Sequence, residues 1–233
     1  MSGTAPRLKT PLPLPAGTWP KGRSPLAHLL HALNQPLTGL QCALELAVAS
    51  PRPPVDYVRI LREALELASR MRTLVEAIRE LVSLQEEETG GIELCPLDAL
   101  LRETVEDLRP VAETRSVHIL VALDTGLLVQ ADRAHLTTLT FRLLESALSL
   151  AGEGSELRVT ARRERERVIV VASWSPGLPA ERSPLSRPEL GLLIARAAWE
   201  RAGGEWISTQ AEKTQTSTVR LSFKAAAPRM PEP

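Results

Sequence analysis

The chain has 233 residues, 43% of them hydrophobic, and its 28 basic and 28 acidic side chains give a net charge of zero. This composition supports one large folded domain or two small ones, and the neutral balance argues against a general nucleic-acid or membrane-surface binder. Cys42 and Cys95 form no disulfide framework and no metal-ligand pattern, and no apolar run reaches the ~18 residues of a membrane span. Without a signal-peptide pattern either, we expect a cytoplasmic protein.

The first half of the chain predicts two long helices. Residues 1–23 are rich in proline and glycine and predict a disordered tail, after which Ser24-Pro25 is typical of a helix start. The proline-rich stretch 50–54 ends this helix, and a second one runs to about Glu88. Both helices carry an apolar face, which in the first has the alternating spacing of a heptad seam. The two faces consist of Leu26, Leu30, Leu33, Leu37, Leu40, Leu44 and Ala47, and of Val58, Leu61, Leu65, Ala68, Val75, Ile78 and Val82.

A helical hairpin over residues 24–88 buries such a seam only in part. Two hairpins that pair as a four-helix bundle would bury it fully, so we expect a homodimer. Residues 92–224 then predict an α+β domain, with strands at 92–97, 117–123, 205–210 and 217–223, a β-hairpin at 155–174, and helices at 97–115, 133–151 and 189–202. This order favours a two-layer α/β sandwich with an antiparallel sheet, followed by a disordered tail at 225–233.

The stretch "HALNQPLTGL", residues 31–40, resembles the phosphoacceptor box of two-component histidine kinases, where a proline follows the histidine after five residues. The hairpin resembles their dimerisation and phosphotransfer domain, and the α+β domain resembles their ATP-binding domain. The resemblance implies that His31 accepts phosphate and points away from the bundle, and that Pro36 bends the helix beyond it. His28 has no proline at the matching distance. We expect His118 and His135 to be structural.

Two positions near His31 bear on its chemistry. Many active members of the family carry Glu or Asp directly after the histidine, as a base or hydrogen-bond partner, whereas this chain has Ala32. Gln35 stands where the family often uses a Thr, Asn or Gln to position water for receiver dephosphorylation. Its amide either does the same here or simply solvates the helix surface.

The second domain departs from the family at the positions that bind ATP and magnesium. The family supplies a magnesium ligand from a helix asparagine, but Ser146 is the matching residue, and the only asparagine of the chain is Asn34 in the histidine box. In the adenine loop, Ser173 and Ser175 replace the aspartate and the first glycine, and only Gly177 is kept. The resemblance therefore implies that the magnesium and adenine contacts are lost.

The phosphate-binding part is altered as well. About a dozen proline-rich residues separate Gly177 from Gly191, too few for a mobile lid, and Glu189 replaces a glycine where its carboxylate would repel phosphate. Trp174 has the size to fill space that a nucleotide needs. Gly203 and Gly204 fit a helix C-terminal cap. We expect no bound ATP, no magnesium, no other cofactor and no metal site.

Three functions remain open. The first is a histidine phosphotransferase in a phosphorelay, which exchanges phosphate between His31 and the receiver aspartate of a response regulator without ATP. The second is a non-catalytic adaptor that docks a response regulator, which Ala32 favours. The third is an ATP-dependent sensor histidine kinase with divergent boxes. We rank them in this order and expect no membrane and no nucleic-acid partner, because the run "RRERER" at 162–167 alternates in charge as a solvated hairpin does.

Overall fold

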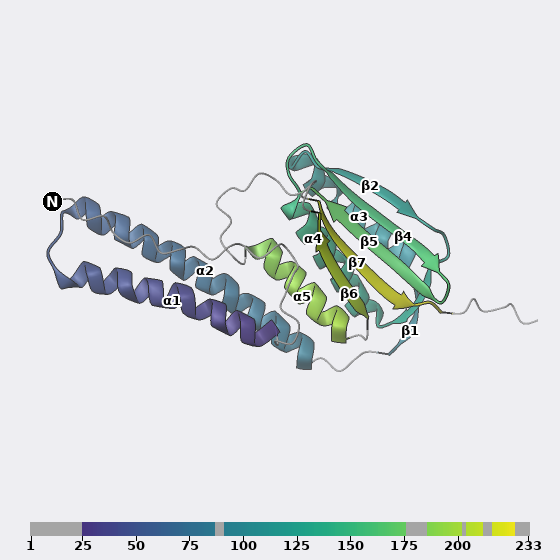
Figure 1. The fold of residues 1–233 in the computed structure, drawn as a ribbon, viewed down its shortest axis with the longest axis horizontal. Helices are drawn as coiled ribbons and strands as arrows, with labels where there is room; N and C mark the ends of the chain where they lie inside the picture. The colour runs from purple at the N-terminus through teal and green to yellow at the C-terminus, as the bar shows by residue number, and fades with distance from the viewer. Residues whose placement is uncertain (1–24, 87–90, 176–185, 202–203, 212–215, 227–233) are drawn as a thin grey trace, which may run out of the picture.

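The structure is a computed structural model, and it describes residues 25–86, 91–175, 186–201, 204–211 and 216–226. A long helical hairpin projects from one side of an α/β sandwich, and helix α5 lies between the two parts (Figure 1). The predicted fold class, a helical hairpin followed by a two-layer sandwich, is confirmed. The tail predicted at 1–23 lies outside the described residues.

The hairpin consists of α1 (Pro25–Ala49) and α2 (Pro54–Glu86). The turn between them contains Pro51 and Pro53, and its form is fixed by hydrogen bonds of Arg52, whose backbone amide donates to the Tyr57 hydroxyl and whose side chain donates to the Leu46 carbonyl. Proline cannot supply the amide that would continue a helix through this turn.

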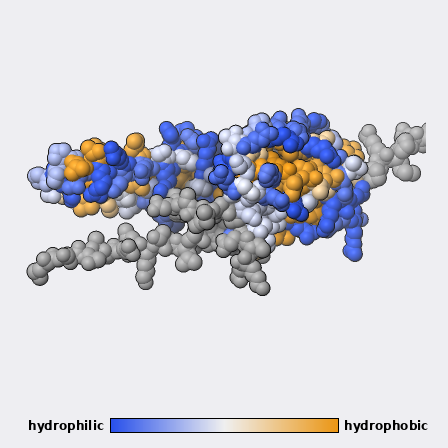
Figure 2. All heavy atoms as spheres, turned by 90° about the horizontal axis from the view of Figure 1, so that it is seen from above, coloured by the Kyte–Doolittle hydropathy of each residue, from blue (hydrophilic) through white to orange (hydrophobic). Residues whose placement is uncertain are grey.

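The face buried within the single hairpin lies about one position away from the predicted seam, which was expected to be fully buried only between two hairpins. Leu29, Ala32 and Pro36 of α1 are buried, and so are Ile60, Ala64, Leu74, Ala77 and Leu81 of α2. The predicted seam residues Leu30, Leu37 and Leu44 are exposed instead, as are Val58, Leu61 and Leu65. A helix that packs against its hairpin partner and also against other surfaces has a wide apolar stripe, so spacing alone does not tell which edge meets the partner. Hydrophobic side chains consequently lie open at the far end of the hairpin (Figure 2).

The second part of the chain forms a three-helix layer against a sheet. Its elements are β1 (Glu93–Pro96), α3 (Leu97–Thr114), β2 (His118–Leu123), β3 (Leu128–Ala131), α4 (Arg133–Leu150), β4 (Glu156–Glu164), β5 (Arg167–Trp174), α5 (Arg187–Arg201), β6 (Glu205–Gln210) and β7 (Ser217–Lys224). The large sheet has the order β2-β4-β5-β7-β6, and β1 pairs with β3 in a separate two-stranded sheet.

Two features of the sheet differ from the prediction. The pairing of β2 with β4 is parallel, so the sheet is mixed, because α4 crosses between these strands. Strand β3 was not predicted, since its four residues are too few for a clear alternating pattern. The chain also remains attached beyond β7, where Ala225 bridges to Val129 and Ala226 is buried, although we expected a disordered tail from 225.

Helix α5 is buried on two faces and joins the hairpin to the sandwich. Leu192, Ala195 and Trp199 belong to the main core between the helices and the sheet. The opposite face joins the hairpin in a second apolar group, here called the junction cluster, which consists of Leu29, Ala32, Leu74, Ala77, Leu81, Leu190, Leu193 and Ile194. An ion pair of 2.9 Å between Arg142 of α4 and Glu80 of α2 lies across the same junction.

Candidate functional site

His31 lies exposed on α1, and Gln35 lies one helical turn further on, also exposed. Side chains four residues apart share a helix face, so the imidazole and the amide face the same surroundings. This placement matches the outward position that the resemblance implies for His31. A partner that reaches the imidazole is therefore also within range of the Gln35 amide.

Pro36 is buried directly beside this face, inside α1. Because proline has no amide hydrogen, the carbonyl of Ala32 loses its helical donor. One turn on, the Thr38 hydroxyl donates to the Asn34 carbonyl at 2.9 Å, a contact that often accompanies bent helices. Burial of the proline ring offsets part of the cost of the lost hydrogen bond.

Ala32, unlike the exposed His31, is buried in the junction cluster, with 9% of its surface exposed. A glutamate or aspartate at this position would place a carboxylate among leucines, which is costly without a partner. The alanine that follows the histidine is therefore consistent with the packing of this chain, and His31 has no adjacent carboxylate in sequence.

Ser146, where the resemblance leads us to expect the magnesium ligand, is buried against protein in this structure. Ser146 of α4 is 3% exposed, and it packs against Gly191 of α5 so closely that a Cβ on Gly191 would clash with its hydroxyl oxygen. The start of α5 thus lies directly on α4. Ser146 and Gly191, predicted from separate motifs, are brought together in a packing contact.

Glu189 closes the amino terminus of α5. Its carboxylate accepts a hydrogen bond of 2.9 Å from the backbone amide of Ser186, and the Leu190 amide donates to the Ser186 carbonyl. The sequence Ser-Arg-Pro-Glu has the Ser-x-x-Glu spacing of a capping box, a signal that the sequence analysis missed. Amides at a helix start are a ready anion site, and here a carboxylate of the chain itself already satisfies one of them.

The remaining predicted nucleotide positions lie around the end of β5. Trp174 is fully buried in the main core, and within the described residues its indole nitrogen has no hydrogen-bond partner. Ser173 is half-buried, and Ser175 is exposed with its carbonyl accepting from the Gly152 amide. Gly177 falls outside the described residues, as does the segment expected to form a lid.

At the other end of α5, the Gly204 amide donates to the Trp199 carbonyl, and a Cβ on Gly204 would clash with the Trp199 ring. This agrees with the helix-capping role expected of it, whereas Gly203 lies outside the described residues. Within the part of the chain that the structure describes, no group of three or more His, Cys, Asp or Glu residues is placed to hold a metal ion. The described helices include none that is long and apolar enough to cross a membrane.

Residues 25–87 match the model of the His Kinase A (phospho-acceptor) domain. Two curated relatives extend the match into the second domain. The alginate biosynthesis sensor protein KinB of Pseudomonas aeruginosa is 31% identical over 158 residues, which cover 64% of this chain and 26% of that protein. The signal transduction histidine-protein kinase/phosphatase MprB of Mycobacterium leprae is 27% identical over 65% of this chain and 30% of its own length. The chain thus spans less than a third of these relatives.

Solved structures share the fold over most of the chain. The histidine kinase AdeS of Acinetobacter baumannii has a TM-score of 0.53 and 17% identity, over 84% of this chain and 98% of that one. A histidine kinase from Burkholderia phymatum has a TM-score of 0.52 and 16% identity, over 88% and 100%. At these identities the likeness concerns the fold alone.

Proposed function

We propose that the chain belongs to the two-component histidine kinase family, because residues 25–87 match its phospho-acceptor domain. In this proposal it carries a phosphoryl group on His31 and exchanges it with the receiver aspartate of a response regulator, without binding ATP itself. The observation that carries this proposal is the contact between Ser146 and Gly191. It supports the proposal because Ser146 is the residue expected to replace the family's magnesium ligand, while His31 is exposed on its helix.

The chemistry needs little from this chain beyond placement. The lone pair of an imidazole nitrogen of His31 attacks the phosphorus of the aspartyl phosphate. The bond from phosphorus to the aspartate oxygen breaks, and the carboxylate leaves with the electron pair. The other ring nitrogen gives its proton to water, which leaves a neutral phosphoimidazole ring. The receiver supplies the magnesium ion, so phosphoryl transfer depends mainly on positioning and on charge neutralisation.

Gln35 acts on the same face in this proposal. Its amide reaches groups that dock against His31, and it holds either the phosphoryl oxygens or a water molecule. With water in line, the receiver phosphate is hydrolysed instead of transferred. Replacement of Gln35 by alanine should therefore change the balance between transfer and hydrolysis rather than abolish phosphorylation of His31.

The second candidate is an ATP-dependent histidine kinase, and the sensor kinases among the relatives favour it. It requires α5 to move away from α4, since Ser146 is buried under Gly191. It also requires a phosphate site beside a glutamate that caps the helix. The third candidate, an adaptor, rests on Ala32, which leaves His31 without an adjacent base.

One set of measurements separates these functions. Calorimetric titration with magnesium and ATP should give no heat beyond dilution, and a micromolar dissociation constant would establish the kinase instead. Incubation with radiolabelled phospho-receivers should place an acid-labile, base-stable label on the chain. The label should disappear in His31→Ala and persist in His28→Ala, which serves as the matched control. A receiver that binds tightly without donating label would support the adaptor function instead.

A further inference from the structure

A cavity of about 520 Å³ lies between the end of the hairpin and the second domain. It is separate from the predicted nucleotide position, because it opens at the first turns of α4, around Leu136, whereas Ser146 lies ten residues further along. Leu139, the lining residue of α4 nearest to Ser146 in sequence, is seven residues away, which is about 10 Å at a rise of 1.5 Å per residue. The volume is within the range of small-molecule sites, which hold roughly 300 to 1,000 Å³.

Apolar and aromatic side chains line the inner part of this cavity. Leu136 and Leu139 come from α4, Trp199 from α5 and Phe223 from β7, and all four are at most 8% exposed. The rings of Trp199 and Phe223 meet edge to face, with centroids 3.8 Å apart and an interplanar angle of 81°. The Trp199 indole nitrogen donates to the Glu205 carbonyl at 3.0 Å, which fixes the ring as a wall.

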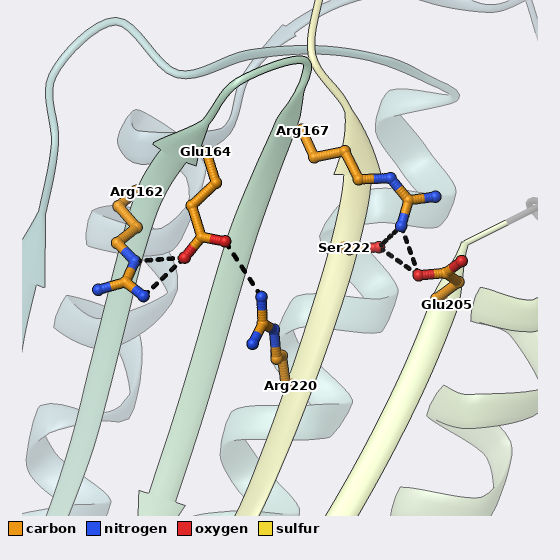
Figure 3. Close-up of polar contacts among 6 residues, drawn as sticks. All are labelled: Arg162, Glu164, Arg167, Glu205, Arg220 and Ser222. Atoms are coloured by element: carbon orange, nitrogen blue, oxygen red, sulfur yellow. Dashed lines mark hydrogen bonds and ion pairs between the residues drawn. The ribbon is translucent and has the colours of Figure 1, made fainter.

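Several charged groups at the rim are already engaged. The Asp132 carboxylate accepts from the His135 backbone amide at 3.2 Å and contacts the His135 ring, and these contacts lower the pKa of the Asp132 carboxyl. The Arg167 guanidinium donates to Glu205 and to the Ser222 hydroxyl (Figure 3). Asp132 and Arg167 therefore already have partners within the chain.

Two rim residues remain, one of each sign. Glu166 and Lys224 line the cavity, both side chains are exposed, and neither takes part in an ion pair within the described residues. Register brings them near one another, because Lys224 pairs with Arg167 and the Ala225 amide donates to the Glu166 carbonyl. The cavity thus offers an aromatic interior with one free cation and one free anion at its edge.

We propose that this cavity binds a small zwitterion with an aromatic body, of the type of a free aromatic amino acid. The ring lies against Trp199 and Phe223, the carboxylate of the ligand meets Lys224, and its ammonium group meets Glu166. An uncharged aromatic molecule leaves both rim charges without partners. A molecule with a single charge leaves one of them.

The walls of the cavity also include Leu84 of α2 and Ile92, which precedes β1. A ligand in the cavity therefore contacts the hairpin and the second domain together. Since binding to one arrangement stabilises that arrangement by mass action, the ligand favours the docked state seen here. This consequence does not depend on the chemistry of His31.

The test uses L-phenylalanine as the probe, with 3-phenylpropionate and phenethylamine as matched analogues that lack the ammonium group and the carboxylate. Saturation-transfer NMR on the full chain should show L-phenylalanine bound, with both analogues at least tenfold weaker. Lys224→Met should remove the preference for L-phenylalanine over phenethylamine, and Glu166→Gln the preference over 3-phenylpropionate. Both variants change exposed side chains, so the fold should be retained, which circular dichroism checks.

Three results would overturn the proposal. The first is absence of L-phenylalanine binding at millimolar concentration. The second is equal binding of all three probes, which would show that the rim charges do not select the ligand. The third is an unchanged preference in both variants, which would place the bound probe elsewhere on the protein.

Discussion

Replacement of Leu193 by alanine should release the second domain from the hairpin while leaving its own core intact. Leu193 is 2% exposed and belongs to the junction cluster between α5 and the hairpin. The neighbouring Leu192 is equally buried, but it faces the main core. The two residues therefore form a matched pair on opposite faces of one helix, and the pair separates docking from folding.

The size of the effect follows from the burial of the side chain. Truncation of a fully buried leucine to alanine costs about 2 to 5 kcal/mol, depending on how far the site relaxes. If this cost falls on the junction, the docking equilibrium changes by roughly 30-fold to several thousand-fold, since each 1.4 kcal/mol is a factor of ten. The Arg142–Glu80 ion pair should add little, because both side chains are about a third exposed and such pairs contribute about 0 to 1 kcal/mol.

Small-angle scattering and thermal unfolding measure the two quantities. Leu193→Ala should increase the radius of gyration and leave the main unfolding transition of the second domain nearly in place. Leu192→Ala should lower that transition and leave the dimensions of the folded protein unchanged. If both variants lower the same transition equally and neither changes the dimensions, α5 is part of one undivided core and the reasoning is wrong.

Three further predictions concern the dimer, the packing of Ser146 and acid stability. Light scattering at micromolar concentration should give a dimer for the wild type and a monomer for Leu37→Glu, since Leu37 is 38% exposed on the predicted seam. Ser146→Asn should lower the melting temperature without restoring ATP binding in a titration, because the larger side chain has no room beneath Gly191 and overpacking costs about 1 to 3 kcal/mol. The pKa of the Asp132 carboxyl is lowered, first by the hydrogen bond from the His135 amide, so the ionised carboxylate stabilises the folded state above the ordinary carboxyl pKa range. This stabilisation is lost on acidification. As the pH falls below about 4, Asp132→Asn should therefore lose less thermal stability than the wild type.

Periodicity predicted the elements of this chain well, because long helices and alternating strands repeat their pattern over many residues. The hairpin break at 50–54 was confirmed, and so was the order of helices and strands in the second half apart from β3. The tertiary placement of faces was harder to predict. Leu30 and Leu29 are neighbours in sequence and both are leucine, yet one is 48% exposed and the other fully buried. Only the position of α5 and α2 decides between them.

The site residues divide in the same way. His31 and Gln35 could be assigned from local sequence, since a spacing of four places them on one helix face. The contact of Ser146 with Gly191 joins residues 45 positions apart, and no local pattern predicts it. Ala32 could be recognised as a departure from the family, but its reason, the junction cluster, required the structure. Glu189 is the opposite case, because the capping box stood in the sequence and was interpreted only as a repulsive charge.

The role of Glu189 bears on how single substitutions would affect the nucleotide binding that we propose is lost. A glycine at this position would leave the Ser186 amide free for a phosphate and would weaken the start of α5. Glutamate instead satisfies that amide within the chain, so the helix start gains stability without a ligand. Replacement of Glu189 by glycine alone frees one amide but leaves Ser146 buried, and replacement of Ser146 alone leaves the carboxylate at the helix start. Ser146 and Glu189 both stabilise the start of α5, the helix that also packs against the hairpin. Replacement of either residue alone should therefore lower the stability of the fold without giving affinity for ATP.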